Sequence, residues 1–579
     1  MKRFSMSIVS SMAAAAAFAQ APTITAVLDA GAYTSNLSPG IVFVVKGTNL
    51  CGTSATAAAP APYTTAPMGG ASISLTPVAG GAAISAYMVY CYNASGLTQL
   101  AAELPNGTAP GDYNVTVSSN GSTSAAFKTT VVARKFEILT LSGSGSGRAT
   151  VTDANYQVNS FTTSSGKAPA KPTGALIVWG TGLGAAVGYD ATAPAALDFL
   201  AQGVDVKAIV GGVEVTPFFA GRNNVYPGLD NIGVPLPANV PTGCTVSFQI
   251  RVAGQLSNMT MISIAPDANS SACVDPQYSP SVLSKLDSGG VLNIGYFNLT
   301  SFASNLSFQG QNFSTRVEAA SGAFAQYTSD TITQIPNLAS AASGTCSVYT
   351  ATTTSAGGGP VSNLKYLDAG AITLNGPNVS NKAFTKTNNV YSLALGTAIT
   401  GGNLPPIPIP GFNSQPLITA GTYTVAGAGG ADVGAFSSSI NIHQPLSVTG
   451  GLPSTVNRSQ NLTLNWTGSG SGDVVIIAGT SSVLVSGTPQ NGTFNTGTFV
   501  CTTTGDKQTF TVPSSILLQL PASPAGGAPG SSVGTLEVFS TSTPTTGNGL
   551  FTAPLTAGGN TDFALFTAGI GTTSLPTYQ

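Results

Sequence analysis

One pattern, an apolar run followed by Gly-Thr-x-Leu, occurs twice and constrains the fold more than any other feature of the chain. Its copies are Ile41–Leu50 and Ala175–Gly184. Each run is short, rich in β-branched and aromatic residues and bounded by glycine, which is typical of a buried β-strand. We therefore expect Ile41–Val45 and Leu176–Trp179 to be core strands, with the glycines at the ends where the chain leaves the sheet.

The residues after each copy also repeat in order. A Leu-Pro pair follows at Leu104–Pro105 and again at Leu236–Pro237, and a turn with proline and glycine opens the next strand at Pro110 and at Pro241. The unit is much longer than the roughly 20–50 residues of a solenoid repeat. The pattern therefore predicts a domain that occurs in tandem.

This order of strands and turns resembles the immunoglobulin-like IPT/TIG domain, in particular the tandem copies of uncharacterised secreted bacterial proteins. The resemblance covers residues 21–266. The second copy fits well and includes the Gly211–Gly212 turn, whereas the first copy lacks this turn and has Cys51 and Cys91 instead. The resemblance implies an immunoglobulin-like fold and an extracellular setting, and it implies no shared catalytic residues.

The rest of the chain contains further short apolar runs separated by Gly-, Pro- and Ser-rich turns, including expected short strands at 291–297, 305–308, 315–317 and 347–349. Such runs predict an all-β protein of tandem immunoglobulin-like β-sandwich domains. Trp466 on an early strand and Cys501 on a later one indicate an immunoglobulin-like core for the last domain. The predicted segments are a signal peptide at 1–19, IPT/TIG-like domains at 20–133 and 134–273, and β-sandwich domains at 274–443 and 444–579.

Two tyrosines, Tyr113 and Tyr423, each stand at the start of an expected strand. A tyrosine corner at that position would bond the hydroxyl back to the preceding loop. Leu404–Gly411 contains alternating prolines and is expected to be an extended loop, because proline cannot donate a hydrogen bond to a β-ladder.

The first residues predict export. Lys2 and Arg3 precede the apolar stretch Ile8–Phe18, and an Ala-Phe-Ala cleavage site ends at Ala19, so that the mature chain would begin at Gln20. No later apolar run is long enough to span a bilayer. We therefore expect a secreted or cell-surface protein.

An even number of cysteines in an exported chain predicts disulfides, and no Cys-x-x-Cys spacing indicates a metal site. Six cysteines allow 15 pairings. Proximity within the expected domains favours two local pairs, which leaves a third pair between regions assigned to different domains. The candidates are Cys51 with Cys91, Cys244 with Cys273, and Cys346 with Cys501.

The charge content excludes one class of partner. Only 7% of the residues are charged and the formal net charge is −2, against a typical charged share of about 25%. Without a basic stripe there is no electrostatic footprint for nucleic acid.

No catalytic, cofactor-binding or metal-binding residue is predicted. Gly180–Gly184 lacks the third glycine spacing and the following helix of a dinucleotide-binding loop. His443, the one histidine, lies between the third and fourth domains without a G-x-S-x-G motif, and is expected at a hinge or on the surface. The acids are scattered and are expected mostly to cap turns; those considered for paired-carboxylate or calcium chemistry are Asp190, Asp198, Asp230 and Asp432.

We therefore expect a secreted, non-catalytic protein that serves in extracellular binding, adhesion or scaffolding, with an unknown protein or glycan as ligand. Loops carry recognition on such folds, which points to Cys51–Gly70, Gly184–Gly203 and Gly401–Ser414. The alternative is a carbohydrate-binding accessory protein or an exported carbohydrate-active enzyme. Exposed aromatic side chains on one sheet face would favour this alternative, and Phe218, Phe219 and Tyr226 are the candidates. A wall or sheath component would instead require exposed strand edges.

Overall fold

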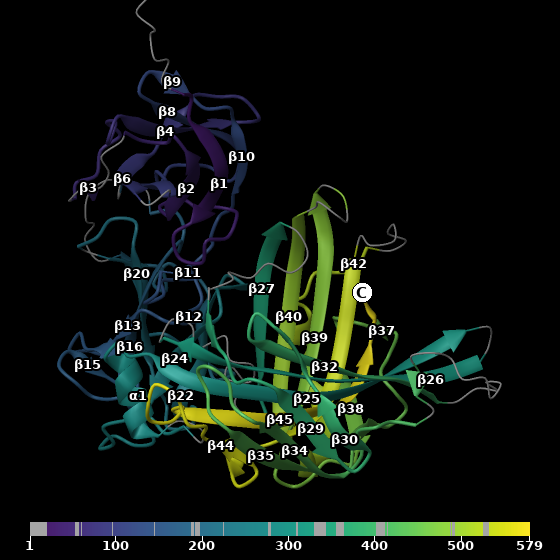
Figure 1. Ribbon diagram of the computed structural model, residues 1–579. Coiled ribbons are helices and arrows are strands. Elements are labelled where there is room, and N and C mark those ends of the chain that lie inside the picture. Colours follow the sequence, from purple (N-terminus) through teal and green to yellow (C-terminus); the bar gives the residue numbers. More distant parts are fainter. Residues whose placement is uncertain are drawn as a thin grey trace, which may run out of the picture.

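The computed structural model describes residues 20–579 with the exception of 53–56, 59–60, 95–96, 144, 187–189, 191–196, 224, 276–278, 309–310, 329–342, 355–363, 401–411, 414, 487, 489–492 and 525–531. The described residues form an all-β protein built of packed sheets (Figure 1). The signal peptide predicted at 1–19, the Leu404–Gly411 loop and much of the three recognition loops lie outside the described residues.

Domain 1 is a sandwich of two antiparallel sheets. Its strands are β1 (Thr23–Asp29), β2 (Val42–Thr48), β3 (Ala57–Ala58), β4 (Ala71–Pro77), β5 (Ile84–Ser85), β6 (Tyr87–Ala94), β7 (Leu97–Glu103), β8 (Gly111–Ser119), β9 (Ser122–Thr123) and β10 (Phe127–Val131). One sheet has the order β1-β2-β7-β6-β3 and the other β10-β8-β4-β5, with β9 beside β8. In β4, Ala71, Ile73 and Leu75 are buried in the core between the sheets, because alternate side chains of a strand point to one face.

Domain 2 repeats this design. Its strands are β11 (Glu137–Ile138), β12 (Gly147–Arg148), β13 (Val151–Thr152), β14 (Val158–Asn159), β15 (Lys167–Ala168), β16 (Ala175–Thr181), β17 (Leu197–Asp198), β18 (Val206–Val210), β19 (Val213–Val215), β20 (Phe219–Arg222), β21 (Asp230–Pro235), β22 (Gly243–Val252), β23 (Gln255–Leu256) and β24 (Thr260–Ile264). One sheet has the order β15-β14-β13-β16-β21-β20-β17 with β11 beside β16, and the other β12-β24-β22-β18-β19 with β23 beside β22. Leu176 and Val178 of β16 face the core with Phe248 and Ile250 of β22.

The glycines of the repeated pattern do not end the strands, contrary to the sequence-based expectation. β2 continues through Gly47 to Thr48, and β16 continues through Gly180 to Thr181. In β16 the extension is paired, because Glu137 of β11 lies opposite Thr181. The chain leaves β16 at Gly182, which has a φ of +106°.

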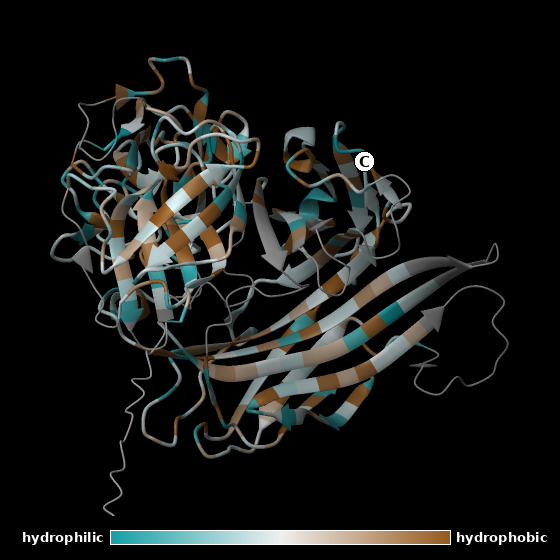
Figure 2. Ribbon diagram, turned by 90° about the horizontal axis from the view of Figure 1, so that it is seen from above, coloured by the Kyte–Doolittle hydropathy of each residue, from teal (hydrophilic) through white to brown (hydrophobic). Residues whose placement is uncertain are grey.

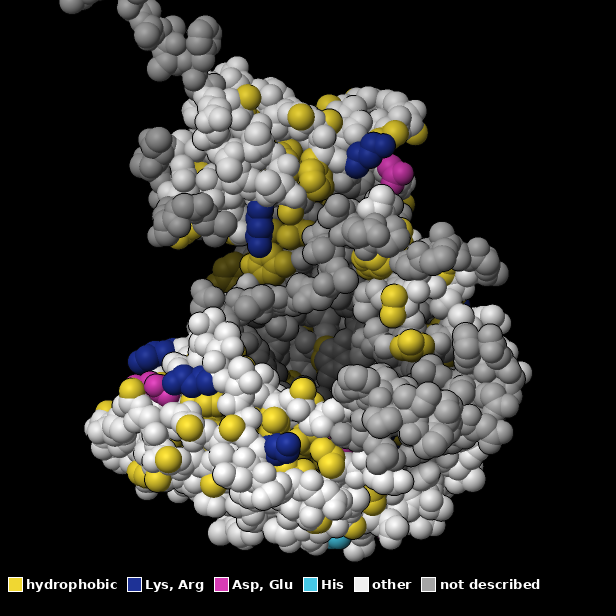
Figure 3. Space-filling view, turned by 45° about the vertical axis from the view of Figure 1, so that its right-hand side comes forward, with side chains coloured by type: hydrophobic (Ala, Val, Ile, Leu, Met, Phe, Trp, Pro, Cys, Tyr) yellow, Lys and Arg dark blue, Asp and Glu magenta, His cyan; other side chains and the backbone are white. Residues whose placement is uncertain are grey.

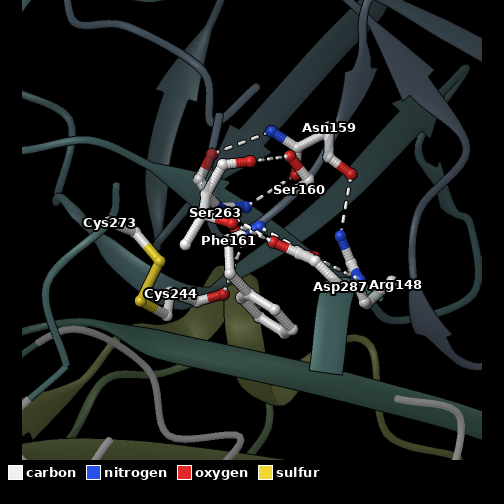
Figure 4. The surroundings of a disulfide bond; sticks show 9 residues. Arg148, Asn159, Ser160, Phe161, Cys244, Ser263, Cys273 and Asp287 are labelled. Atoms are coloured by element: carbon white, nitrogen blue, oxygen red, sulfur yellow. Dashed lines mark hydrogen bonds and ion pairs between the residues drawn. A yellow bond between two sulfur atoms is a disulfide. The ribbon is translucent and has the colours of Figure 1, made fainter. Parts of the chain in front are cut away.

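A short helix, α1 (Pro280–Asp287), follows domain 2 (Figure 1). Ser279 caps its N-terminus and Pro280 occupies the first turn, a signature that would have revealed it in the sequence. Asp287 accepts hydrogen bonds from the backbone N–H groups of Phe161 (3.2 Å) and Thr162 (2.7 Å) and forms an ion pair with Arg148 (3.3 Å). The Cys244–Cys273 disulfide lies beside this contact (Figure 4). No helix in the described parts of the chain is long and apolar enough to cross a membrane.

The C-terminal unit, residues 280–579, is built on one large sheet. Besides α1 it contains β25 (Leu292–Phe308), β26 (Gln311–Tyr327), β27 (Cys346–Thr354), β28 (Lys365–Leu367), β29 (Ile372–Gly376), β30 (Val379–Ala383), β31 (Thr385–Thr387), β32 (Val390–Thr400), β33 (Phe412–Asn413), β34 (Gly421–Gly427), β35 (Phe436–Ile442), β36 (Ser447–Val448), β37 (Thr455–Val456), β38 (Leu462–Thr467), β39 (Asp473–Ser486), β40 (Thr493–Thr504), η2 (Gly505–Lys507), β41 (Thr509–Val512), α2 (Ser514–Leu517), β42 (Ser532–Ser542), β43 (Thr545–Thr546), β44 (Gly549–Phe551), β45 (Phe563–Ser574) and β46 (Thr577–Tyr578).

The boundary predicted between 443 and 444 divides a single sheet. The sheet has the order β27-β40-β39-β42-β45-β25-β26-β32-β31, and β45 pairs in parallel with β25 from Ile294↔Phe563 to Ser304↔Thr573. Strands from both predicted domains therefore alternate in one hydrogen-bonded ladder. A smaller sheet, β30-β29-β34-β35, covers one part of it, and β36-β38-β41 covers another, with a hydrophobic core under each.

The strands of the large sheet are longer than the sequence suggests. The expected strands at 291–297, 305–308 and 315–317 are parts of one long hairpin, β25–β26. Figure 2 shows these strands curving across the unit with hydrophobic and hydrophilic residues interspersed. Polar residues such as Asn298 and Thr300 lie within β25 because strands on both sides bond its backbone.

Both tyrosine corners and the tryptophan core are present. The Tyr113 hydroxyl donates to the Ala109 carbonyl at 2.8 Å, and the Tyr423 hydroxyl donates to the Leu417 carbonyl at 3.1 Å. Trp466 is buried in a core that also contains Cys501. The predicted local packing of these strands is therefore correct.

The structure pairs the cysteines as Cys51–Cys91, Cys244–Cys273 and Cys346–Cys501. The third disulfide joins β27 to β40, where its two cysteines lie opposite each other. It connects regions that the sequence assigns to separate domains, which the shared sheet explains.

Candidate functional site

The second copy of the repeated pattern lies at the junction of domains 1 and 2. Thr181 Oγ1 accepts a hydrogen bond from the Val42 backbone N–H at 2.9 Å and donates to the Gly228 carbonyl at 2.6 Å. The Ser38 hydroxyl donates to the Gly182 carbonyl at 3.2 Å. Gly182 is required there because a Cβ atom would lie 1.9 Å from the Lys135 carbonyl oxygen. The pattern therefore binds the two sandwiches together.

A buried arginine strengthens the same junction. The Arg222 and Asp230 side chains are fully buried and form an ion pair at 2.9 Å. Arg222 also donates to the carbonyls of Gly40 (3.0 Å) and Gly184 (2.7 Å) and to Asn106 Oδ1 (3.1 Å). Gly40 and Asn106 belong to domain 1, so this guanidinium connects both domains.

A second ionic cluster lies beside it. The Lys135 ammonium contacts Asp29 at 2.8 Å and Glu137 at 3.1 Å and donates to the Thr34 hydroxyl at 2.6 Å. Burial opposes ionisation of Asp29, but Lys135 and backbone N–H groups outweigh it and lower the pKa of Asp29. Burial raises the pKa of Glu137 to about 7 despite the contacts with Lys135 and the Asn258 backbone N–H. Glu137 is therefore the one member of this cluster expected to titrate near neutrality.

Replacing Glu137 with glutamine is expected to stabilise the protein in mild alkali. Between the ordinary pKa of 4.5 and the folded value of about 7, the folded chain keeps a proton that the unfolded chain releases, so wild-type stability falls as pH rises through this window. E137Q mimics the protonated form and should lose this dependence, with a gain of up to about 3 kcal/mol at pH 8, since one pKa unit corresponds to about 1.4 kcal/mol. Urea unfolding at pH 5 and pH 8 measures it.

The matched control for this titration is Glu214→Gln, because Glu214 is an exposed glutamate on the same domain. It should leave the pH dependence of the wild type in place. Equal pH dependence in E137Q and the wild type would show that Glu137 is ionised throughout.

Two cavities lie along the contact between domain 2 and the C-terminal unit. A polar one of about 650 Å³ is lined by residues next to the Lys135 cluster, by the β22–β23 turn and by Asn495 and Gln519. A smaller one of about 300 Å³ is lined by Ile209, Phe510 and Ile516, among others. Leu256 and Gln519 line both cavities, so the two adjoin.

The outer face of the β16-β21-β20 sheet of domain 2 carries a set of aromatic side chains. Leu176, Val178 and Ala220 of these strands point to the core, so the alternate residues Trp179 and Phe219 point away from it. With Phe218 and Tyr226 they form what we call the aromatic face: Trp179, Phe218, Phe219 and Tyr226.

The aromatic face is open to solvent. Phe218 is 56% exposed and Tyr226 is 52% exposed, and Trp179 and Phe219 are half-buried. The rings of Trp179 and Tyr226 have centroids 6.5 Å apart. The Phe218 ring lies over Gly233 and the Phe219 ring over Gly221, where a Cβ atom would lie 2.4 Å and 2.5 Å from the respective ring. Glycine is therefore needed beneath both rings.

Polar groups border these rings. Asn231 lies opposite Trp179 in the sheet, and Asn223 donates to the Asn231 side chain at 2.5 Å. Asn223 Oδ1 in turn accepts from the Tyr226 backbone N–H at 2.7 Å, which fixes the segment that carries Tyr226. The Trp179 indole N–H donates to Thr152 at 3.3 Å. The face thus combines exposed rings with amide and hydroxyl groups.

Charged side chains are sparse on the surface shown in Figure 3, where several of them lie beside a side chain of opposite charge among hydrophobic and uncharged ones. The residues of the aromatic face and its polar border carry no formal charge. The same sheet carries the carboxylate of Asp198, opposite Gly221 on the neighbouring strand β17, where it accepts from the Leu200 and Ala220 backbone N–H groups.

The remaining candidate residues have structural surroundings. Asp198 accepts from the Leu200 backbone N–H two residues on, as expected for an acid that caps its own turn, and also from that of Ala220. Asp432 accepts from the backbone N–H of Asp368, a distant residue in sequence, and so joins two loops. Asp190 accepts from the Asn106 backbone N–H at 2.6 Å, which places it at the junction of domains 1 and 2. Asp230 is the buried partner of Arg222 and not a turn cap.

The His443 Nδ1 atom lies 3.0 Å from Asp473 Oδ1, and the side chain is 43% exposed. The hydroxyls of Ser469 and Ser542 donate to the carboxylate of Asp473 and not to the imidazole. No hydroxyl nucleophile is thus bonded to His443 in the described parts of the chain.

One member of the aromatic face was assigned wrongly from the sequence. Trp179 was expected in the core as the end of the Leu176–Trp179 run, but it lies on the outer face. The two-residue period of a strand would have revealed this, since Leu176 and Val178 are the inward residues. The other members, Phe218, Phe219 and Tyr226, are the aromatic residues that the sequence analysis named.

No protein-family model matches the chain, and no curated protein does. Among solved structures it is similar to SGBP-B of the Bacteroides ovatus mixed-linkage glucan utilization locus, solved with a mixed-linkage heptasaccharide (11% identity, TM-score 0.18, 62% of this chain and 65% of that one). It is also similar to the Yersinia pseudotuberculosis adhesin InvE (10%, 0.12, 50% and 66%) and to the FN1–FN3 domains of chicken CNTN1 (6%, 0.12, 70% and 92%). The aligned region spans less than two thirds of the length of the first two.

Proposed function

We propose that this protein is an exported, non-catalytic binding protein whose domains 1 and 2 are IPT/TIG-like, and that the aromatic face of domain 2 binds carbohydrate. The observation that carries the proposal is the pair of half-exposed rings, Phe218 and Tyr226, beside Trp179 on one sheet face. The apolar N-terminal segment and the three disulfides support export.

The chemistry of the face fits a sugar. A pyranose ring presents C–H groups on one face, which pack on an aromatic ring, and hydroxyls at its rim, which bond to amides and hydroxyls. Aromatic side chains dominate binding energetics when they are covered, and exposed clusters of them mark binding sites. Asn231 and Thr152 lie where they can reach the rim of a sugar stacked on Trp179.

The aromatic face also has a preformed geometry. Gly221 and Gly233 leave flat backbone beneath the phenylalanine rings, and the Asn223 hydrogen bonds hold the Tyr226 segment. A site that needs little reorganisation loses less entropy on binding. This supports a role in recognition over a role in packing.

Replacing Trp179 or Tyr226 with alanine is expected to weaken binding about tenfold or more, the order of magnitude for removing an aromatic anchor. Affinity gel electrophoresis of the mature chain in gels containing cellulose derivatives, xylan, mannan or β-glucan measures this. Tyr156→Ala is the matched control, because Tyr156 is 75% exposed on domain 2 but is not part of the aromatic face.

Absence of retardation by any polysaccharide would refute the carbohydrate-binding proposal. Equal loss in the Tyr156 control would show that the rings act non-specifically. Release of sugar from any of these polysaccharides by the purified chain would refute the non-catalytic part.

A further inference from the structure

We infer, resting on the proposed carbohydrate-binding function, that the site continues across the domain boundary onto Tyr63 and Tyr87 of domain 1. We further infer that its ligand is an uncharged polysaccharide chain. The aromatic face of domain 2 would then be one half of a composite site, and domain 1 would supply the other half.

The segment that carries Tyr226 lies directly against domain 1. Gly228, two residues further on, packs so closely that a Cβ atom would lie 2.6 Å from Val42 Cγ2 and 3.3 Å from Glu103 Cγ. The Gly228 carbonyl accepts from Thr181, which also accepts from the Val42 backbone N–H. Tyr226 is therefore fixed next to the boundary and not on a free loop.

Two tyrosines of domain 1 lie on the other side of this boundary. Tyr87 of β6 is paired in the sheet with Glu103 of β7, the residue that Gly228 contacts. Tyr63 precedes Thr64, whose carbonyl accepts from the Met88 backbone N–H at 2.8 Å, so Tyr63 stands beside the same strand. Both phenols are half-buried.

The electrostatics agree with this placement. Burial raises the pKa of Tyr63, and the nearby groups that add to the effect are Glu103 and Tyr226. Burial likewise raises the pKa of Tyr87, with Asp190 and Glu103 contributing. Tyr87 and the segment that carries Tyr226 thus both adjoin Glu103, and Tyr63 stands beside the strand of Tyr87 on the domain 1 side of the boundary.

The charges at the boundary disfavour an acidic ligand. Three cations at this boundary already have partners. Arg222 is fully buried and bonded to Asp230 and three other acceptors, Lys135 contacts Asp29 and Glu137, and Arg134 donates to the Leu183 carbonyl. The carboxylates of Glu103 and Asp190 lie close to the Tyr87 phenol. A polyanion would be repelled by the half-buried Asp190 and by the negative charge of the buried Glu103 beneath the surface, whereas a neutral chain would meet aromatic rings and amides.

The arrangement favours a polymer over a single sugar. The rings come from β16 and the segment before β21 in domain 2 and from the loop before Thr64 in domain 1, so a chain that crosses the boundary can contact both groups with successive units. The Arg222 and Lys135 clusters hold the two domains together, so both halves of the site keep one geometry.

The test compares Tyr63→Ala, Tyr63→Phe and Tyr226→Ala in the mature chain by isothermal titration calorimetry. The probes are long and short oligosaccharides of whichever neutral polysaccharide retards the wild type in gels, and polygalacturonate as the acidic probe. Tyr63→Ala should lower affinity for the long oligosaccharide about five- to tenfold, as for loss of one aromatic anchor. It should leave the short one nearly unaffected, and Tyr63→Phe should retain binding because the ring remains.

The outcomes separate the two proposals. If Tyr226→Ala abolishes binding and Tyr63→Ala leaves it unchanged for every ligand, the composite site is refuted and the proposed function stands. If no neutral oligosaccharide binds the wild type, the proposed function itself fails. Tighter binding of polygalacturonate than of neutral chains would overturn the assignment of an uncharged ligand. Thermal melts confirm that each variant is folded.

Discussion

Replacing Arg222 with methionine is expected to destabilise domains 1 and 2 by about 3–5 kcal/mol, the usual cost of removing one partner of a buried ion pair. Both Arg222 and Asp230 are fully buried, and the substitution would leave the Asp230 carboxylate without its counterion. It would also leave the Gly40 and Gly184 carbonyls without a donor from this side chain. Urea unfolding of the mature chain measures the loss.

The matched control is Arg251→Met, because Arg251 forms an ion pair with Glu214 at 2.7 Å in the same domain but both side chains are partly exposed. Exposed pairs contribute about 0–1 kcal/mol. A loss at Arg222 no larger than the loss at Arg251 would contradict a structural role for the buried network. Arg222 contacts both domains. R222M should therefore also lower the affinity for any ligand that binds to domains 1 and 2 together.

Removing the Cys346–Cys501 disulfide by a double alanine substitution is expected to cost about 4–5 kcal/mol in the C-terminal unit. The two cysteines are 155 residues apart, and a crosslink that closes a long loop removes more entropy from the unfolded chain than one that closes a short loop. The disulfide also joins β27, the edge of the large sheet, to β40. Thermal and urea unfolding measure the effect.

The matched control is the double alanine substitution of Cys244 and Cys273, which also removes one disulfide between two buried cysteines. These cysteines are also buried, but they are only 29 residues apart, so the cost should be smaller by about 1–2 kcal/mol. Equal losses at both sites would show that native-state packing, and not loop length, sets the contribution of the long disulfide.

The local elements of domains 1 and 2 could be predicted because the alternation of apolar and polar residues along each strand indicates which side chains are buried. Ala71, Ile73 and Leu75 alternate with serines along β4, and the Gly211–Gly212 turn joins β18 to β19. The tyrosine corners at Tyr113 and Tyr423 were predictable for the same reason, since their hydrogen bonds join residues close in sequence.

The large sheet could not be predicted in this way. β25 pairs with β45, although more than half of the sequence of the C-terminal unit lies between the two strands. The residues within a strand do not indicate which distant strand will lie beside it. Ser and Asn residues usually indicate turns in a sequence. Within β25 they occur in a strand, because β26 and β45 on either side form hydrogen bonds with its backbone. The separation of 274–443 from 444–579 was wrong for this reason.

The repeated Gly-Thr stretch shows most clearly which features the amino-acid sequence determines and which depend on the tertiary structure. The amino-acid order alone predicted Ile41–Val45 and Leu176–Trp179 as core strands, a domain that occurs in tandem, and Phe218, Phe219 and Tyr226 as the aromatic residues of interest. Only the tertiary structure decided that Thr181 and Gly182 join domain 1 to domain 2, that Trp179 faces outward, and that the segment carrying Tyr226 packs against domain 1 through Gly228. Periodicity records which face of a strand is buried, whereas contacts between domains depend on which surfaces the folded chain brings together.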